Sequence, residues 1–174
     1  PWVIVEPDAL PQVGMCEGQG DRAGMLQQAA ATMTAAGARV YLDAGHSDWL
    51  TTAQAIRSLE RVGFTDAVGF ALNTSNFGST ADERAYGESI AKGLEDDVSF
   101  IVDVSRNGRG SNGEWCNPPD RALGVVPRLV NDRSTLDALL WVKAPGESDG
   151  TCHGGPAAGE WWQERALELS RNRR

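Results

Sequence analysis

The chain has 174 residues, of which 41% are hydrophobic and 23% charged, and its formal net charge is −8 at pH 7. This length and composition indicate one globular domain, or a large part of one, and exclude a fibrous or disordered chain. The acidic balance argues against a nucleic acid partner, because phosphate binding requires a basic face. No stretch approaches the roughly 18 consecutive apolar residues of a membrane span, so we expect no membrane partner either.

Five short apolar segments predict strands, in chain order Trp2–Val5, Arg39–Leu42, Ala67–Leu72, Ser99–Val104 and Asp137–Val142. Their apolar residues are mostly continuous rather than alternating, which is typical of parallel strands covered on both faces. The first strand begins without a lead-in segment, which suggests that the chain starts in the middle of a domain.

Helices are predicted at about residues 22–36, 52–62, 81–95 and 158–171. The first ends before Gly37, a residue suited to the left-handed position after a helix. Thr51 with Gln54, and Thr80 with Glu83, both fit the capping box, in which the two side chains satisfy free backbone amides reciprocally.

The alternation of strands and helices predicts an α/β fold with a parallel sheet, either an open doubly wound sheet or a barrel. Five strands would not close a parallel barrel, so in a barrel this chain would be the C-terminal part. In both architectures ligands bind at the carboxyl ends of the strands. One irregular stretch, Asn107–Arg133, interrupts the alternation, and loops of that length are usually functional. Within it, Gly108 to Gly113 matches G-x-G-x-x-G, but no helix is predicted to follow, so we interpret it as a loop.

Polar side chains recur where the predicted strands end. The carboxylates are Glu6, Asp8, Asp43, Asp103, Glu147 and Asp149; Asn73, Asn76, Arg106 and Lys143 accompany them, and Trp49 and Trp115 lie in the adjoining loops. Single acids often cap helices or form salt bridges, but several strands that end alike favour a shared site. Indole rings stack on pyranose rings, and cleavage of a glycosidic bond requires one protonated and one ionised carboxyl group. The set therefore predicts a sugar site.

The three cysteines, Cys16, Cys116 and Cys152, form no C-x-x-C pair, and the chain has only two histidines. We therefore expect no structural zinc site. From composition alone, a Cys116–Cys152 bridge and three reduced thiols remain equally open.

A series of segments resembles glycoside hydrolase family 6, the cellulases that cleave β-1,4-glucan with inversion at the anomeric carbon. In order they are IVEPDAL, VYLDAGHSDWL, FALNTSNF, DVSRNGRG, EWCNPPDRALG, LWVKAPGESDGTC and GPAAGEWW, and they cover essentially the whole chain. The resemblance implies a distorted, incomplete α/β barrel of about seven strands, roughly five of them in this chain. It also implies a glucan bound across the C-terminal face, no cofactor or metal, and a secreted, extracellular enzyme that we expect to be a monomer.

By this resemblance, Asp8 of the E-P-D motif is the general acid that protonates the leaving oxygen. Burial at a strand end and a neighbouring negative charge would both keep such an acid protonated. Asp43 is a further site aspartate, which serves substrate binding and charge balance. Asp149 matches the residue most often proposed as the base, and a water chain to another aspartate is the alternative.

The same resemblance suggests the substrate contacts. Lys143 and Glu147 match residues that hydrogen-bond glucose hydroxyls, and Trp49 and Trp115 match stacking platforms on either side of the cleavage point. Three further positions are Arg106, expected to pair with site carboxylates, and Asn73 and Asn76, expected to bind substrate. His46 either contacts sugar or packs in its tight turn.

The family also carries an aspartate in a D-R-D-C motif upstream of E-P-D, which nothing in this chain matches. The cysteine of that motif would pair with Cys16, and Cys116 with Cys152 matches the second family disulfide. We therefore expect residues 1–174 to be the C-terminal portion of the catalytic domain and to be poorly active alone.

Exo-acting members enclose their site with long loops, one of them after the D-G-T motif. Here Thr151 leads within a few residues to Gly159, which leaves no room for a lid and favours an endo-acting enzyme with an open cleft. The alternatives are an exo-acting cellobiohydrolase, a non-catalytic carbohydrate-binding domain, and a metal-dependent hydrolase that uses Asp8, Asp43 and His46.

Overall fold

The computed structural model describes residues 1–5, 7–15, 18, 20–64, 69–94 and 98–173. In chain order its elements are β1 (Trp2–Val5), α1 (Arg22–Ala35), β2 (Arg39–Asp43), α2 (Thr52–Val62), β3 (Gly69–Leu72), α3 (Thr80–Gly93), β4 (Ser99–Asp103), β5 (Arg128–Leu129), β6 (Leu136–Leu140), the short 3₁₀ helix η1 (Cys152–Gly154) and α4 (Gln163–Asn172). None of the helices in this part of the chain has the length and apolarity that crossing a bilayer requires.

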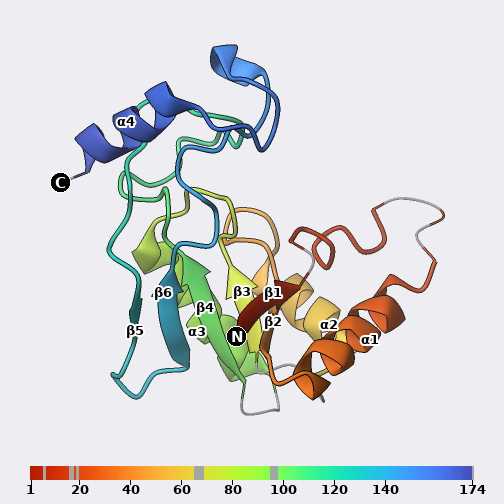
Figure 1. Ribbon diagram of the computed structural model, residues 1–174. Helices are drawn as coiled ribbons and strands as arrows, with labels where there is room; N and C mark the ends of the chain where they lie inside the picture. Colours follow the sequence, from red (N-terminus) through yellow and green to blue (C-terminus); the bar gives the residue numbers. More distant parts are fainter. Residues whose placement is uncertain (6, 16–17, 19, 65–68, 95–97, 174) are drawn as a thin grey trace.

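The strands form one sheet in the order β1-β2-β3-β4-β6-β5. Strands β1 to β4 and β6 pair in parallel, and β5 pairs antiparallel with β6 at the edge. Helices α1, α2 and α3 each connect two neighbouring parallel strands, as in a βαβ unit. The carboxyl ends of the parallel strands therefore share one edge of the sheet, and α4 lies beyond that edge (Figure 1).

Successive strand side chains point to opposite faces of the sheet. Val40 and Leu42 of β2 belong to the large hydrophobic core that also contains buried apolar residues of α1, α2 and α3. Tyr41, between them, belongs to a smaller cluster with Ala71 and Ile101 on the other face. Each layer of the core thus follows from the alternation along a strand.

A hydrogen bond of Tyr41 shows that the sheet is curved. The Tyr41 hydroxyl donates a 2.6 Å hydrogen bond to Asp137 of β6, although β3 and β4 lie between the two strands. The β4–β6 register passes from Phe100↔Leu136 to Ile101↔Ala138, so Asp137 is the extra residue of a β-bulge. A contact across two strands requires a curled sheet, and the predicted incomplete barrel is confirmed as a half-barrel.

The five predicted parallel strands and four helices are present; β1 and α2 have the predicted bounds, and the ends of the others are shifted. Strand β5 was not predicted, because a two-residue strand inside 107–133 carries no hydrophobic pattern. The glycine-rich segment at 108–113 is followed by further irregular backbone and is a loop, as predicted. Glu6, Cys16, the start of the predicted third strand (67–68) and residue 95 lie outside the described residues.

The last helix begins later than predicted, at Gln163 rather than at about residue 158. Trp161 forms an isolated β-bridge with Glu147, and the N–H of Trp162 donates a 2.7 Å bond to the carbonyl of Gly146. These bonds hold the backbone extended up to the N-cap.

One of the two predicted helix caps is wrong. Helix α2 begins with the predicted reciprocal capping box. Helix α3, however, is capped by Ser79 rather than Thr80, and the Ser79 hydroxyl accepts a bond from the N–H of Asp82. The Glu83 side chain is therefore free of the cap, and it is buried instead.

Helix α3 packs closely on the sheet at Gly87, which gives a test of the core. A Cβ added there would lie 2.3 Å from Cε2 of Phe100, and Phe100 is buried and stacked on Phe70 with ring centroids 5.4 Å apart. We predict that Gly87→Ala lowers the free energy of unfolding by about 2 kcal/mol, although alanine favours helices. Denaturant unfolding measures this, with exposed Glu88→Ala as the control. Unchanged stability of Gly87→Ala would contradict the close packing.

Candidate active site

The buried carboxylate of Asp103, at the end of β4, holds the strand ends together. Oδ1 accepts backbone N–H bonds from Ser105 (2.9 Å) and Val142 (3.2 Å), and Oδ2 accepts them from Ser75 (2.9 Å) and Lys143 (3.1 Å). The donors follow β3, β4 and β6. One anion, stabilised by charge-assisted hydrogen bonds, therefore fixes the beginnings of three loops.

Asn73, at the end of β3, belongs to the same frame. It is 0% exposed, and its Nδ2 donates to the carbonyl of Asp103 (2.8 Å) while its Oδ1 accepts the N–H of Gly78 (2.9 Å). Its φ of 62° is left-handed, a conformation that asparagine tolerates. The amide is thus used inside the protein, which places Asn73 behind the site surface rather than among substrate contacts. Asn76 is half-buried, and its N–H donates to the Asn73 carbonyl (2.9 Å).

Asp8 and Asp43 meet at the ends of β1 and β2. The N–H of Asp8, a residue with a left-handed φ of 68°, donates a 2.9 Å bond to Oδ2 of Asp43. Burial raises the pKa of Asp43 to about 7; the bond from the Asp8 backbone opposes this, and the negative charge of Asp8 adds to it. Asp43 is 1% exposed, whereas Asp8 is open to solvent.

Partial burial also raises the pKa of Asp8, and the charge of His46 opposes this rise. Asp8 lines a hollow of about 490 Å³ between the β1–α1 loop and α1, together with Pro7, Arg22 and Met25. A carboxyl group that stays protonated above its ordinary range and faces open space is what a general acid requires.

The loop between β2 and α2 carries His46 and Trp49, whose ring centroids are 5.8 Å apart. Both side chains are half-buried, and Trp49 packs against the core. Burial lowers the pKa of His46, against the opposing charges of Asp48 and Asp8. The N–H of Asn73 donates a 2.7 Å bond to the carbonyl of Gly45, which joins this loop to the frame around Asp103.

Arg106 and Asp149 form an ion pair beneath the surface. Nη1 of Arg106 lies 2.9 Å from both carboxylate oxygens of Asp149, and the arginine is 0% exposed. The guanidinium also donates to the Ser75 carbonyl and lies 4.4 Å from the ring centroid of Phe77. Burial lowers the pKa of Arg106, and the charge of Asp149 opposes that shift.

Asn117 also holds Asp149, although it was not among the predicted site residues. Its N–H donates to Oδ2 of Asp149 (3.0 Å), and its Oδ1 accepts the N–H of Asp149 (2.9 Å). The adjacent Cys116 forms a disulfide with Cys152, with Cα atoms 6.2 Å apart, as the family resemblance implies. The segments around residues 116–117 and 149–152 are thus tied at two points. The position of Asn117 directly after a bridged cysteine was the available signal.

The remaining predicted substrate contacts are the polar side chains of Lys143 and Glu147 and the indole of Trp115. Nζ of Lys143 lies 3.2 Å from Oε2 of Glu147, so these two side chains form a pair at the end of β6. Trp115 is 68% exposed, which leaves its indole face available for stacking. Its loop follows β4, whereas that of Trp49 follows β2.

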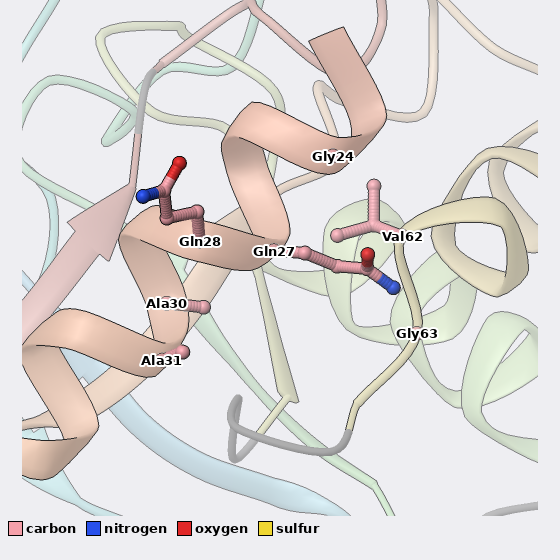
Figure 2. A pocket seen from close by; sticks show the side chains of 7 residues that line it. All are labelled: Gly24, Gln27, Gln28, Ala30, Ala31, Val62 and Gly63. Carbon is pink, nitrogen blue, oxygen red and sulfur yellow. The ribbon is translucent and has the colours of Figure 1, made fainter. Parts of the chain in front are cut away.

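Two further findings concern the surroundings of the site. In the described part of the chain, no group of three His, Cys, Asp or Glu residues is placed to hold a metal ion. A second hollow, of about 430 Å³, lies between α1 and the end of α2 and is lined by Gly24, Gln27, Gln28, Ala30, Ala31, Val62 and Gly63 (Figure 2). None of the predicted site residues lines it.

Carboxyl groups in unlike environments at the strand ends of a curled parallel sheet are the arrangement expected of an acid–base glycosidase. The sequence profile of the Glycosyl hydrolases family 6 matches residues 1–173, and the chain belongs to this family.

Relatives with known sequences or structures agree with this membership. Endoglucanase A of Cellulomonas fimi is 63% identical over 174 residues, which are 100% of this chain and 38% of that protein. Endoglucanase 1 of Streptomyces halstedii is 41% identical over 177 residues, covering 96% of this chain and 54% of that protein. The endoglucanase Cel6 of Mycobacterium tuberculosis, solved in complex with a methyl-cellobiosyl-deoxy-thio-cellobioside, matches with a TM-score of 0.91 at 42% identity, covering 98% of this chain and 61% of that chain. The chain therefore spans less than two thirds of each of these relatives.

The pKa of Asp43 makes a prediction about stability. Because it lies at about 7, above the ordinary 3.8, the folded state binds this proton more tightly than the unfolded state. This contribution is complete below the unfolded pKa and is lost as the pH rises through about 7. We predict that Asp43→Asn, which stays neutral, loses roughly 2 kcal/mol less than the wild type between pH 5 and pH 8. Denaturant unfolding at both pH values measures the difference, and parallel losses would contradict the raised pKa.

Proposed function

We propose that this chain is part of the catalytic domain of an endo-acting β-1,4-glucanase that hydrolyses internal bonds of cellulose or a related β-glucan with inversion. The observation that carries the proposal is the contact between Asp8 and buried Asp43 at the strand ends of a family 6 chain. The relatives described above are named endoglucanases, and one of them was solved with a thio-linked cello-oligosaccharide.

Asp8 is the proton donor in this proposal. As the glycosidic bond breaks, its proton passes to the leaving oxygen, and the carboxyl becomes a carboxylate. Asp43 lies directly beside it, bound to the Asp8 N–H. Partial burial raises the pKa of Asp8, which favours the protonated form that a proton donor requires.

The attacking water comes from the opposite face of the sugar and gives its proton to a base. Asp149 takes this proton directly, or a chain of waters carries it to another aspartate. Arg106 and Asn117 orient the Asp149 carboxylate by three hydrogen bonds. A carboxylate so oriented is able to hold a water molecule in line with the anomeric carbon.

Substrate binding is assigned to the side chains that remain accessible. The indoles of Trp49 and Trp115 stack on sugar rings, while Lys143, Glu147, His46 and Asn76 provide polar contacts to hydroxyl groups. Lys143 and Glu147 hold one another by an ion pair, which orients both toward a hydroxyl. We do not assign Asn73 to this set, since its amide is engaged within the protein.

The segment after Asp149 supports an open cleft. It folds back onto its own base: the Ser148 hydroxyl donates to the carbonyl of Pro156 (2.9 Å), and the N–H of Gly159 donates to the carbonyl of Ser148 (2.9 Å). A segment closed on itself in this way forms no long lid, which supports a cleft that a glucan chain enters from the side rather than a tunnel. This geometry supports the endo mode over a cellobiohydrolase.

We also propose that the enzyme is secreted and acts outside the cell as a monomer. The Cys116–Cys152 disulfide supports an oxidising compartment, where such bonds persist.

The acid assignment predicts a selective loss of turnover. Within the complete catalytic domain, Asp8→Asn should lower kcat on a soluble cello-oligosaccharide by about 10²–10⁴-fold and leave its binding nearly unchanged, because only proton transfer is lost. Initial rates and calorimetric binding measure the two effects, with exposed Glu60→Gln as the control. Full activity of Asp8→Asn would exclude Asp8 as the acid. Wild-type binding without hydrolysis would indicate a carbohydrate-binding domain instead.

The open cleft predicts how a polymer is cut. On a soluble substituted cellulose, we expect viscosity to fall steeply while few reducing ends appear, since internal cuts shorten the chains quickly. Viscometry with a parallel reducing-sugar assay measures this. A slow fall in viscosity with steady release of cellobiose would contradict the endo mode.

A further inference from the structure

Helix α3 carries two buried side chains that hold the β2–α2 loop at two points. Both oxygens of Glu83 accept the N–H of Ser47 (3.2 Å each), and its Oε1 also accepts the Ser47 hydroxyl (2.7 Å). One turn further along α3, the hydroxyl of Tyr86 donates a 2.8 Å bond to the carbonyl of Leu50. The β2–α2 loop is therefore held by α3 at Ser47 and at Leu50.

His46 directly precedes the anchored Ser47 in the chain, and Trp49 lies between the anchored residues Ser47 and Leu50. The backbone of the loop is also fixed just before His46, where the Gly45 carbonyl accepts the N–H of Asn73, and within the turn, where the N–H of Trp49 donates to the carbonyl of His46 (3.0 Å). The rings of His46 and Trp49 are thus presented by a backbone that is fixed from beneath.

Burial of the Glu83 carboxyl group costs free energy of folding, which a purely structural anchor would not require. Glu83 is 0% exposed, and in the described part of the chain no Lys, Arg or His forms an ion pair with it. The charged groups that act on it are the acids Asp48, on the loop, and Asp82, on its own helix. An unpaired buried carboxyl surrounded by like charge opposes stability. Gly78, on the next loop, leaves the space for it, since a Cβ there would lie 2.2 Å from Oε1.

We propose that Glu83 is a positioning residue for substrate binding, which acts through Ser47 to set His46 and Trp49 against the bound sugar. This inference rests on the proposed function, and it adds to it a residue behind the site that sets affinity rather than chemistry. Glu83 contacts neither Asp8 nor Asp43 by any hydrogen bond found among the described residues, so its removal should leave the proton donor in place.

The raised pKa of Glu83 gives this role a dependence on pH. Burial raises its pKa to about 7, the bonds from Ser47 oppose this, and the charges of Asp48 and Asp82 add to it. All its hydrogen bonds from Ser47 are accepted ones, so the ionised form serves the loop best. We therefore expect KM for a cello-oligosaccharide to rise as the pH falls from about 8 to 6, with Glu83 as one source of that change.

The test compares Glu83→Gln, Ser47→Ala and the double variant in the complete catalytic domain, with cellotetraose as substrate and ligand. Each single change should raise KM about fivefold, the size expected for one lost hydrogen bond, and change kcat by less than about twofold. The KM of the double variant should be no higher than the higher KM of the two single variants, because both changes act on the same contact. In Glu83→Gln the dependence of KM on pH should also flatten.

Glu88→Gln, on the exposed face of the same helix, is the matched control. Unchanged KM in both single variants, a loss confined to kcat, or additive losses in the double variant would each overturn the inference. If Glu83→Gln does not fold, half-buried Ser47→Ala decides the question by its KM alone. A wild-type protein that neither binds nor hydrolyses cellotetraose would instead refute the proposed function, so the two failures are distinguishable.

Discussion

The arrangement of the site depends on one buried anion. The carboxylate of Asp103 accepts four backbone N–H bonds from the segments after β3, β4 and β6. Parallel strands end at one edge of a sheet but do not by themselves fix the loops that follow them. Here a single residue does so, and Asn73 extends the frame to Gly45 and the loop of His46. The loops after four strands are thereby held in one arrangement.

The buried carboxyl groups around this frame differ in their hydrogen-bond partners, and they therefore differ in what they can do in the site. Asp103 is satisfied by backbone amides, Asp149 by Arg106 and Asn117, and Glu83 by Ser47. Asp43 accepts a bond from the N–H of Asp8 at one oxygen, while its other oxygen, which is buried, has no hydrogen-bond partner within 3.5 Å among the described residues. Burial raises the pKa of both Asp43 and Glu83 to about 7. The site thus holds carboxyl groups of unlike proton affinity within one frame, which acid–base cleavage requires.

The sequence predicts the fold well where the pattern is local. Continuous apolar runs predict the parallel strands, and the capping box of α2 is found as expected. Features that depend on distant pairing could not be predicted in this way. Strand β5 exists only because β6 offers it an edge, and α4 begins late because Trp161 and Trp162 pair with residues 146–147.

The same distinction holds for the site. Strand-end acids are visible in the sequence, but whether an acid faces substrate or the protein interior is decided by tertiary hydrogen bonds. Asn73 was expected at the surface, and the structure uses its amide internally. Glu83 was assigned to a helix cap, and it anchors a neighbouring loop instead. Asn117 carried no chemical pattern of its own.

The central claim is that Asp8 remains protonated long enough to serve as the acid. Carboxyl ¹³C NMR titration of the complete catalytic domain tests it most directly, with Asp8→Asn used to assign the resonance. We expect Asp8 to titrate above its ordinary value of 3.8, beside an Asp43 that titrates at about 7. An Asp8 carboxyl that titrates at or below 3.8 would be ionised where the enzyme must donate a proton, and it would exclude Asp8 as the acid.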